Sequence, residues 1–150
     1  MSIKLMLSFS NLIFSEGVKR LLDNEKDLQI IEIGNPEAAY TIEKLKAVNP
    51  DIILTDFITL YNSFPGIENA NKKFQFILFD TNLGRDNLVS TILRKKINGV
   101  LLCNANSGLL AKAIRAVHKG ELWIDKQTFK NLLNGINALS SDKAALLSAR

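Results

Sequence analysis

The chain has 150 residues, of which 47% are hydrophobic and 23% charged, a composition typical of one compact globular domain. Its single cysteine and single histidine exclude a disulfide framework and a Cys/His metal site, and it has no apolar run near the ~20 residues of a membrane span, so we expect a cytoplasmic protein. The net charge of +4 combines −3 over residues 1–56 with +7 over residues 57–150, and we interpret most of these lysines as solvated helix surface rather than a nucleic-acid site.

Apolar runs and helical patterns alternate along the first 56 residues. Asn11 can cap a helix because its side chain accepts hydrogen bonds from free backbone amides, and Pro36 suits a first helical turn, where no amide is needed. Pro50 would end the second helix. The predicted elements are a strand over residues 3–9, a helix over 12–22, a strand over 28–33, a helix over 36–48 and a strand over 52–54 that leads into Thr55 and Asp56.

The same alternation continues after a less regular segment. Residues 57–73 have no clean helical stripe, so a loop with at most a short helix is predicted there. Beyond it, the pattern predicts a strand over 74–79, a helix over 86–96, a strand over 100–103 and a helix capped by Ser107 that ends at Gly120. Strands that are apolar on both faces and separated by helices predict an α/β fold with a parallel sheet covered on both sides.

Candidate functional residues follow the predicted strands. In an open parallel sheet the functional crevice lies beyond the carboxyl ends of the strands, where the strand order reverses. The residues at those ends are Ser8, Phe9 and Ser10, then Asp56, then Asp80 and Thr81, and finally Cys103 and Asn104.

Three segments resemble the receiver domain of LuxR/NarL-type response regulators in bacterial two-component systems. They are NLIFSEGVKRLL at residues 11–22, NPDIILTD at 49–56, and NGVLLCNANSGLLAKAIRAVHKGELWID at 98–125, which includes a Gly-x-x-Trp pattern from Gly120 to Trp123. The resemblance covers residues 3–129. It implies a doubly wound, flavodoxin-like α/β fold with five parallel strands in the order 2-1-3-4-5 and helices on both faces.

The resemblance also implies a phosphorylation site, from which this chain departs. In the family, an acidic pair, an aspartate, a threonine or serine and a lysine follow successive strands and hold Mg²⁺ and a phosphoryl group. Asp56 lies at the phosphoacceptor position and Thr81 at the switch position, whereas Phe9 and Ser10 replace the acidic pair and Cys103 replaces the lysine. We therefore expect a degenerate pocket with no catalytic or metal-binding residue and no cofactor, where Mg²⁺ binds weakly and only if Asp56 is used.

Some of these residues also have simpler interpretations. A strand-end aspartate such as Asp56 is more often a helix or loop cap than a phosphoacceptor. Asp80 suits the start of a turn, and Cys103 is expected to be a small apolar filler rather than a redox sensor.

The resemblance divides the chain into residues 1–129, a receiver-like domain, and residues 130–150, a linker. ALSSDKAALLSAR at residues 138–150 resembles the opening helix of a LuxR-type helix-turn-helix domain, with Ser140 or Ser141 as its cap. Specific DNA binding would then require a domain missing from this chain. A simple amphipathic helix is the alternative for this segment.

The function expected from these observations is that of an atypical, non-enzymatic receiver in transcription regulation. It would act by protein–protein contact, as a homodimer, without phosphorylation. The expected output surface covers the last two predicted helices, with the bases Arg94, Lys95, Lys96, Lys112 and Arg115. One alternative is a conventional response regulator phosphorylated on Asp56 by a histidine kinase, and another is a flavodoxin-like protein that binds a nucleotide or flavin.

Overall fold

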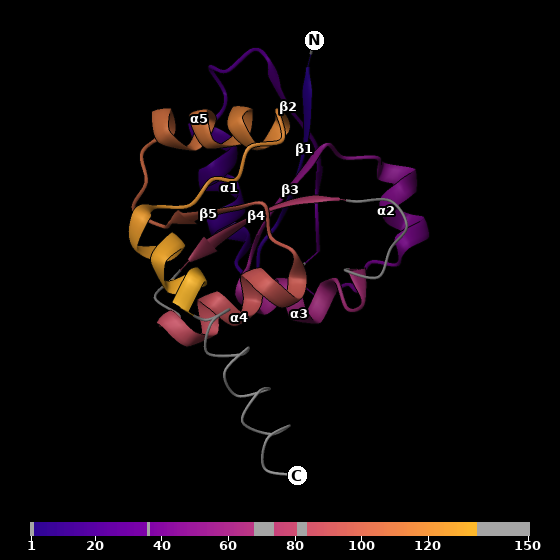
Figure 1. The fold of residues 1–150 in the computed structure, drawn as a ribbon. Coiled ribbons are helices and arrows are strands. Elements are labelled where there is room, and N and C mark those ends of the chain that lie inside the picture. The colour runs from indigo at the N-terminus through magenta and orange to yellow at the C-terminus, as the bar shows by residue number, and fades with distance from the viewer. Residues whose placement is uncertain (1, 36, 68–73, 81–83, 135–150) are drawn as a thin grey trace.

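The computed structural model describes residues 2–35, 37–67, 74–80 and 84–134 (Figure 1). Helices and strands alternate along this part of the chain, and residues 126–134 are helical as well. The elements are β1 (Ile3–Ser8), α1 (Leu12–Leu21), β2 (Leu28–Ile33), α2 (Ile42–Val48), β3 (Ile52–Asp56), α3 (Phe57–Ser63), β4 (Gln75–Asp80), α4 (Arg85–Lys95), β5 (Gly99–Leu102) and α5 (Ser107–His118).

The five strands form one sheet in the order β2-β1-β3-β4-β5, and every neighbouring pair is parallel. This arrangement confirms the predicted fold class, strand order included. The order reverses between β1 and β3, which lie side by side with Ser8 paired to Thr55. The carboxyl ends of these two strands therefore mark the crevice at which ligands of such sheets bind.

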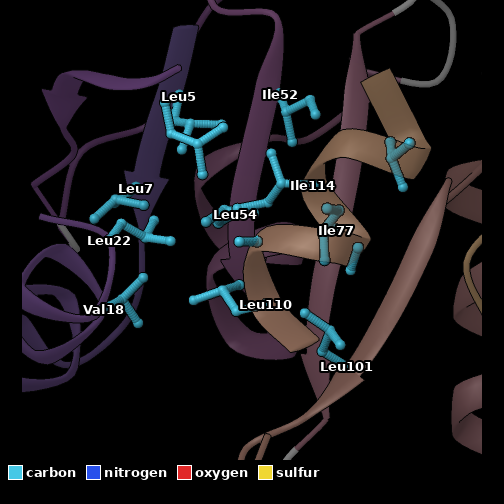
Figure 2. Packing of buried hydrophobic residues seen from close by; sticks show 14 of the residues in the cluster. Leu5, Leu7, Val18, Leu22, Ile52, Leu54, Ile77, Leu101, Leu110 and Ile114 are labelled. Atoms are coloured by element: carbon cyan, nitrogen blue, oxygen red, sulfur yellow. The ribbon is translucent and has the colours of Figure 1, made fainter. Parts of the chain in front are cut away.

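Alternate strand residues serve two separate cores, because successive side chains of a strand point to opposite faces of the sheet. On one face, α1 and α5 pack on the sheet, and Figure 2 shows side chains from both helices meeting those of the strands. On the other face, residues of α2, α3 and α4 pack together with Met6, Ile53 and Leu78. The central strand β3 is largely apolar because both of its faces are buried, whereas the edge strand β2 exposes Gln29 and Glu32.

Side-chain caps fix where several helices begin. Asn11 caps α1, as predicted, and its Oδ1 accepts hydrogen bonds from the backbone amides of Ile13 and Phe14. After β3, the described residues 57–67 contain the short helix α3, which agrees with the prediction of at most a short helix there. The predicted Ser107 cap is wrong, because Asn106 caps α5 through a 2.8 Å hydrogen bond from the Leu109 amide.

The helix predicted from Pro36 is also wrong in its first half. α2 begins at Ile42 with Thr41 as its cap, and the described residues 37–41 are not helical. Tertiary contacts hold this stretch in another conformation: the Tyr40 amide donates to the Ser63 carbonyl at 2.6 Å, and the Tyr40 ring stacks on Phe64. These contacts outweigh the weak preference of a local sequence for helix.

The chain after α5 returns to the sheet at β5. Trp123 forms a parallel bridge with Gly99, and its half-buried side chain packs against the α1/α5 core. Asp125 directly precedes the helix over residues 126–134, and its carboxylate accepts a hydrogen bond from the Thr128 amide in the first turn. The predicted helix-turn-helix start at residues 138–150 lies outside the described residues. No helix in the described part of the chain is long and apolar enough to cross a membrane.

Gly34 allows a close approach between β1 and the segment after β2. A Cβ atom at Gly34 would lie 2.9 Å from both the Ser8 Oγ and the Tyr40 Oη. Because Ser8 is fully buried and cannot easily move, Gly34→Ala is expected to lower the free energy of unfolding by about 1–3 kcal/mol, as measured by urea denaturation. In the double variant, Ser8→Ala removes the hydroxyl that the new methyl group would meet, so the loss of stability from Gly34→Ala should be smaller. If Gly34→Ala instead unfolded at the wild-type urea midpoint, the segment after β2 would have to move away from Ser8 without loss of stability.

Candidate functional site

The predicted site residues Phe9, Ser10 and Asp56 meet at the carboxyl ends of β1 and β3. β1 ends at Ser8, so Phe9 and Ser10 begin the loop into α1, and Asp56 is the last residue of β3. Phe9 is fully buried, Asp56 is half-buried and Ser10 is exposed. The structure thus brings these three residues to the reversal point of the strand order.

Hydrogen bonds engage both carboxylate oxygens of Asp56. The Ser10 amide and hydroxyl donate to Oδ2 at 2.9 and 2.7 Å, and the Thr59 amide donates to Oδ1 at 2.9 Å. The bond from Thr59 makes Asp56 the N-terminal cap of α3. Asp56 therefore joins the loop after β1 to the first turn of α3, which agrees with the capping interpretation.

These hydrogen bonds stabilise the ionised form of Asp56. Burial acts to raise the pKa of this carboxyl, but the hydrogen bonds from Thr59 and Ser10 outweigh it and hold the pKa below the ordinary value of 3.8. Asp56 is consequently a carboxylate near neutral pH.

Phe9 belongs to a cluster of three aromatic rings beside the carboxylate. Its ring centroid lies 4.8 Å from that of Phe14 and 5.2 Å from that of Phe79, and Phe14 and Phe79 are 5.6 Å apart. All three pairs are edge-to-face, an arrangement that aromatic rings favour. An apolar side chain thus occupies the place at which the family resemblance would put an acid.

Cys103 lies in the exposed turn after β5, so the expectation that it fills a buried gap is wrong. Its backbone amide donates to the Asp80 carbonyl at 3.4 Å. Partial burial and the negative charges of Asp80 and Asp56 raise the pKa of the Cys103 thiol, which is therefore neutral near pH 7. Position 103 supplies no positive charge to the crevice.

Asn104 and Thr81 are the remaining predicted site residues. Asn104 is exposed in the same turn as Cys103, and Thr81 lies outside the described residues. Within the described ranges, no group of three or more histidine, cysteine, aspartate or glutamate side chains is arranged to hold a metal ion.

The expected basic surface on α4 and α5 is smaller than the sequence predicts. The Arg115 guanidinium donates two hydrogen bonds to Asp27 at 2.8 Å and one to Glu25 at 2.5 Å, which ties α5 to the loop before β2. The hydrogen bond with Arg115 lowers the pKa of Asp27. Lys95 is buried, with its Nζ 4.8 Å from the centroid of the Tyr61 ring. The exposed bases of the predicted set are Arg94, Lys96 and Lys112.

Comparison with known proteins places this geometry in context. No protein family model matches the chain. Over 136 residues it is 26% identical to the transcriptional regulatory protein LnrK of Bacillus subtilis (strain 168), covering 88% of this chain. The chain spans 61% of the length of LnrK.

Solved structures of response regulators have the same fold. A LuxR-family two-component response regulator from Aurantimonas sp. SI85-9A1 is similar with a TM-score of 0.70 and 16% identity, covering 89% of this chain and 97% of that one. RcsB, solved as two dimers bound to two parallel DNAs, gives a TM-score of 0.70 and 19% identity, covering 88% of this chain and 68% of that one. The described part of the chain thus has the receiver fold, and a curated relative with similar sequence is a transcriptional regulator.

Proposed function

We propose that this chain is the receiver domain of a two-component transcriptional regulator, and that it signals through protein contacts without phosphorylation of Asp56. The observation that carries the proposal is the engagement of Asp56. Among the described residues, three groups of Ser10 and Thr59, in the segments that flank the crevice, donate to its carboxylate. A phosphoryl group on either oxygen would replace bonds that hold α3 and the loop after β1 in place.

The loop after β1 brings no acid to Asp56 that would help to hold Mg²⁺. This ion requires octahedral oxygen coordination and is usually held by carboxylates together with water and phosphate. Asp56 and Asp80 supply carboxylates at the ends of β3 and β4, whereas Phe9 supplies a buried aromatic ring and Ser10 a neutral hydroxyl that already donates to Asp56. No step through a metal is therefore proposed for this domain.

The crevice also has little positive charge to offset a phosphoryl group. Phosphoryl transfer depends on cations that neutralise the charge developing on the phosphoryl oxygens. Cys103 stands where the family resemblance would put a lysine, and a thiol, which its raised pKa keeps neutral rather than anionic, supplies no positive charge. Cysteine in place of this lysine therefore disfavours phosphoryl transfer, as does the replacement of the acidic pair by Phe9 and Ser10.

The proposed output is association with another protein, and a second copy of this chain is the expected partner. The similar protein RcsB was solved as dimers on DNA. By extension, we assign DNA contact in this protein to a domain beyond the described residues. The exposed bases Arg94, Lys96 and Lys112 are available for a negatively charged partner surface.

The test is incubation of the protein with Mg²⁺ and acetyl phosphate, followed by intact mass spectrometry. The expected result is no phosphoryl adduct, because Asp56 is hydrogen-bonded and Phe9 and Ser10 stand where the family resemblance would put the acidic pair. Asp56→Asn and Asp51→Asn serve as matched variants, since the Asp51 carboxylate also accepts a backbone amide, that of Lys4, but lies away from the crevice. A stoichiometric adduct that Asp56→Asn abolishes and Asp51→Asn retains would overturn phosphorylation independence.

A further inference from the structure

Three hydroxyl side chains form a buried polar layer between α3 and the carboxyl end of β1. Ser8 on β1 and Thr59 and Ser63 on α3, here called the hydroxyl layer, are each at most 1% exposed. Within the described part of the chain, their hydroxyl oxygens have no hydrogen-bond partner. A buried hydroxyl that lacks a partner loses its hydration without compensation, so buried polar groups are nearly always bonded to protein or to ordered water.

The strand geometry and the helical repeat bring the hydroxyl layer together. Ser8 points to the same face of the sheet as Met6, which lies in the core shared with α2, α3 and α4. Thr59 and Ser63 are four residues apart on α3 and therefore share one side of that helix. Tyr61, on the opposite side of α3, contacts α4. Thr59 and Ser63 thus lie on the side of α3 that faces β1 and α2.

Tyr40 closes the hydroxyl layer on the side of α2. Its backbone amide donates to the Ser63 carbonyl at 2.6 Å. Its hydroxyl oxygen and that of Ser8 each lie 2.9 Å from the point that a Cβ atom of Gly34 would occupy. These two oxygens are therefore no farther apart than two hydrogen-bond lengths, which is the distance that one water molecule spans. Burial raises the pKa of the Tyr40 hydroxyl, which therefore keeps its proton and can donate.

Thr91 on α4 shows one way in which a buried hydroxyl on a helix finds a partner. Thr91 is also 1% exposed, and its Oγ1 donates at 2.8 Å to the carbonyl of Asn87, four residues earlier in the same helix. Thr59 and Ser63 do not bond to their own helix in this way. Their hydroxyl groups are therefore available to a molecule that lies between α3 and β1.

Charge, size and closure limit what can occupy the hydroxyl layer. Its side chains are neutral, so they cannot compensate a buried ion. Their low exposure leaves no opening for a larger molecule. Serine and threonine are smaller than the leucine and phenylalanine side chains of the neighbouring core, which leaves room. A water molecule needs a space of about one probe sphere and roughly two to four polar partners, and the hydroxyl layer with Tyr40 supplies such partners.

We propose that the hydroxyl layer binds internal water, which joins α3 to β1 and to Tyr40. The water satisfies the Ser8 hydroxyl on one side and those of Thr59 and Ser63 on the other. Asp56 already holds the first turn of α3 through the Thr59 amide. The water is then a second polar attachment of this helix, at the side chains rather than at the backbone.

The first test is Thr59→Val, for which bound water and an unpartnered hydroxyl predict opposite effects. Valine keeps the shape of the side chain and the backbone amide that Asp56 holds, and it removes only the hydroxyl. With water bound, Thr59→Val is expected to lower the urea midpoint. Thr91→Val is the matched control, because it removes a bonded hydroxyl and should lower the midpoint as well. A midpoint for Thr59→Val that is raised or unchanged would overturn the proposal.

A double-mutant cycle tests whether water joins α3 to β1. The loss of stability in Thr59→Val combined with Ser8→Ala should be smaller than the sum of the two single losses, since both remove partners of the same water. Thr91→Val combined with Ser8→Ala should be additive, because Thr91 bonds within α4. The proposed link between α3 and β1 is refuted if both pairs are additive.

A high-resolution crystal structure of the whole chain locates the water directly. The expected result is electron density for a solvent molecule about 2.7–3.2 Å from at least two of the hydroxyl oxygens of Ser8, Thr59 and Ser63. Hydroxyl groups that bond to one another or to backbone carbonyls, with no solvent density between them, would contradict the proposal.

Discussion

Replacing Phe9 with aspartate is expected to unfold the domain rather than to restore a phosphorylation site. Truncation of a buried phenylalanine costs about 3–5 kcal/mol, and an unpaired buried carboxylate adds to that loss. Phe9 is fully buried and contacts the rings of Phe14 and Phe79. Since folded domains have about 5–15 kcal/mol of stability, Phe9→Asp removes most or all of it.

Urea denaturation followed by far-ultraviolet circular dichroism measures this effect. Phe9→Leu is the control, because leucine keeps an apolar side chain at the site and should retain a cooperative transition at a moderately lower midpoint. If Phe9→Asp instead unfolded at the wild-type midpoint, the carboxylate at position 9 would have to reach water. In that case the aromatic cluster would not be what excludes an acid from this position.

The second large effect is expected for Asp56→Ala. This substitution removes the cap of α3 and leaves the Ser10 amide, the Ser10 hydroxyl and the Thr59 amide without their acceptor. Loss of a cap and of hydrogen bonds to a charged group is expected to cost about 2–3 kcal/mol in the free energy of unfolding. Asp56→Asn keeps one carbonyl oxygen for the Thr59 amide and should cost about 1 kcal/mol.

The pH dependence of this loss identifies its origin. The folded-state pKa of Asp56 lies below 3.8, so its contribution is fully present above that value and is lost as the pH falls through the folded-state pKa. The stability difference between wild type and Asp56→Ala should thus be largest near neutral pH and shrink in acid. Asp51→Ala, which removes a carboxylate that accepts the Lys4 amide, controls for the loss of one such hydrogen bond. A difference that is constant with pH would contradict the role of the Asp56 charge.

Much of the fold could be predicted because its signals are local. The strands are mostly apolar, and Asn11 stands directly before a helical pattern, so both features can be recognised in the sequence. The helix predicted from Pro36 failed because the Tyr40 amide and ring are held by α3, a contact between residues far apart in sequence. Asn106 and Ser107 can both cap a helix, and only the backbone conformation decides between them.

The site was predictable in position but not in interactions. The strand ends identified Asp56, Phe9 and Ser10, yet the hydrogen bonds between Ser10 and Asp56 depend on how the loop after β1 closes over β3. The sequence places Arg115 on an output surface, because its partner Asp27 is 88 residues away and the pairing leaves no local pattern.

The return of the chain to β5 determines how this sheet can meet another protein. β5 is an edge strand, and edge strands are sites where an extra strand from a partner can add. Here the Val100 amide donates to the Trp123 carbonyl at 2.8 Å, and the Trp123 amide donates to the Asn98 carbonyl at 3.0 Å. Gly99 permits close packing at this edge, since a Cβ atom there would lie 3.1 Å from the Val117 Cγ2 and 3.3 Å from the Ile77 Cγ1. The chain thus supplies its own partner at this edge, so a second protein must recognise this side by its side chains rather than by strand addition.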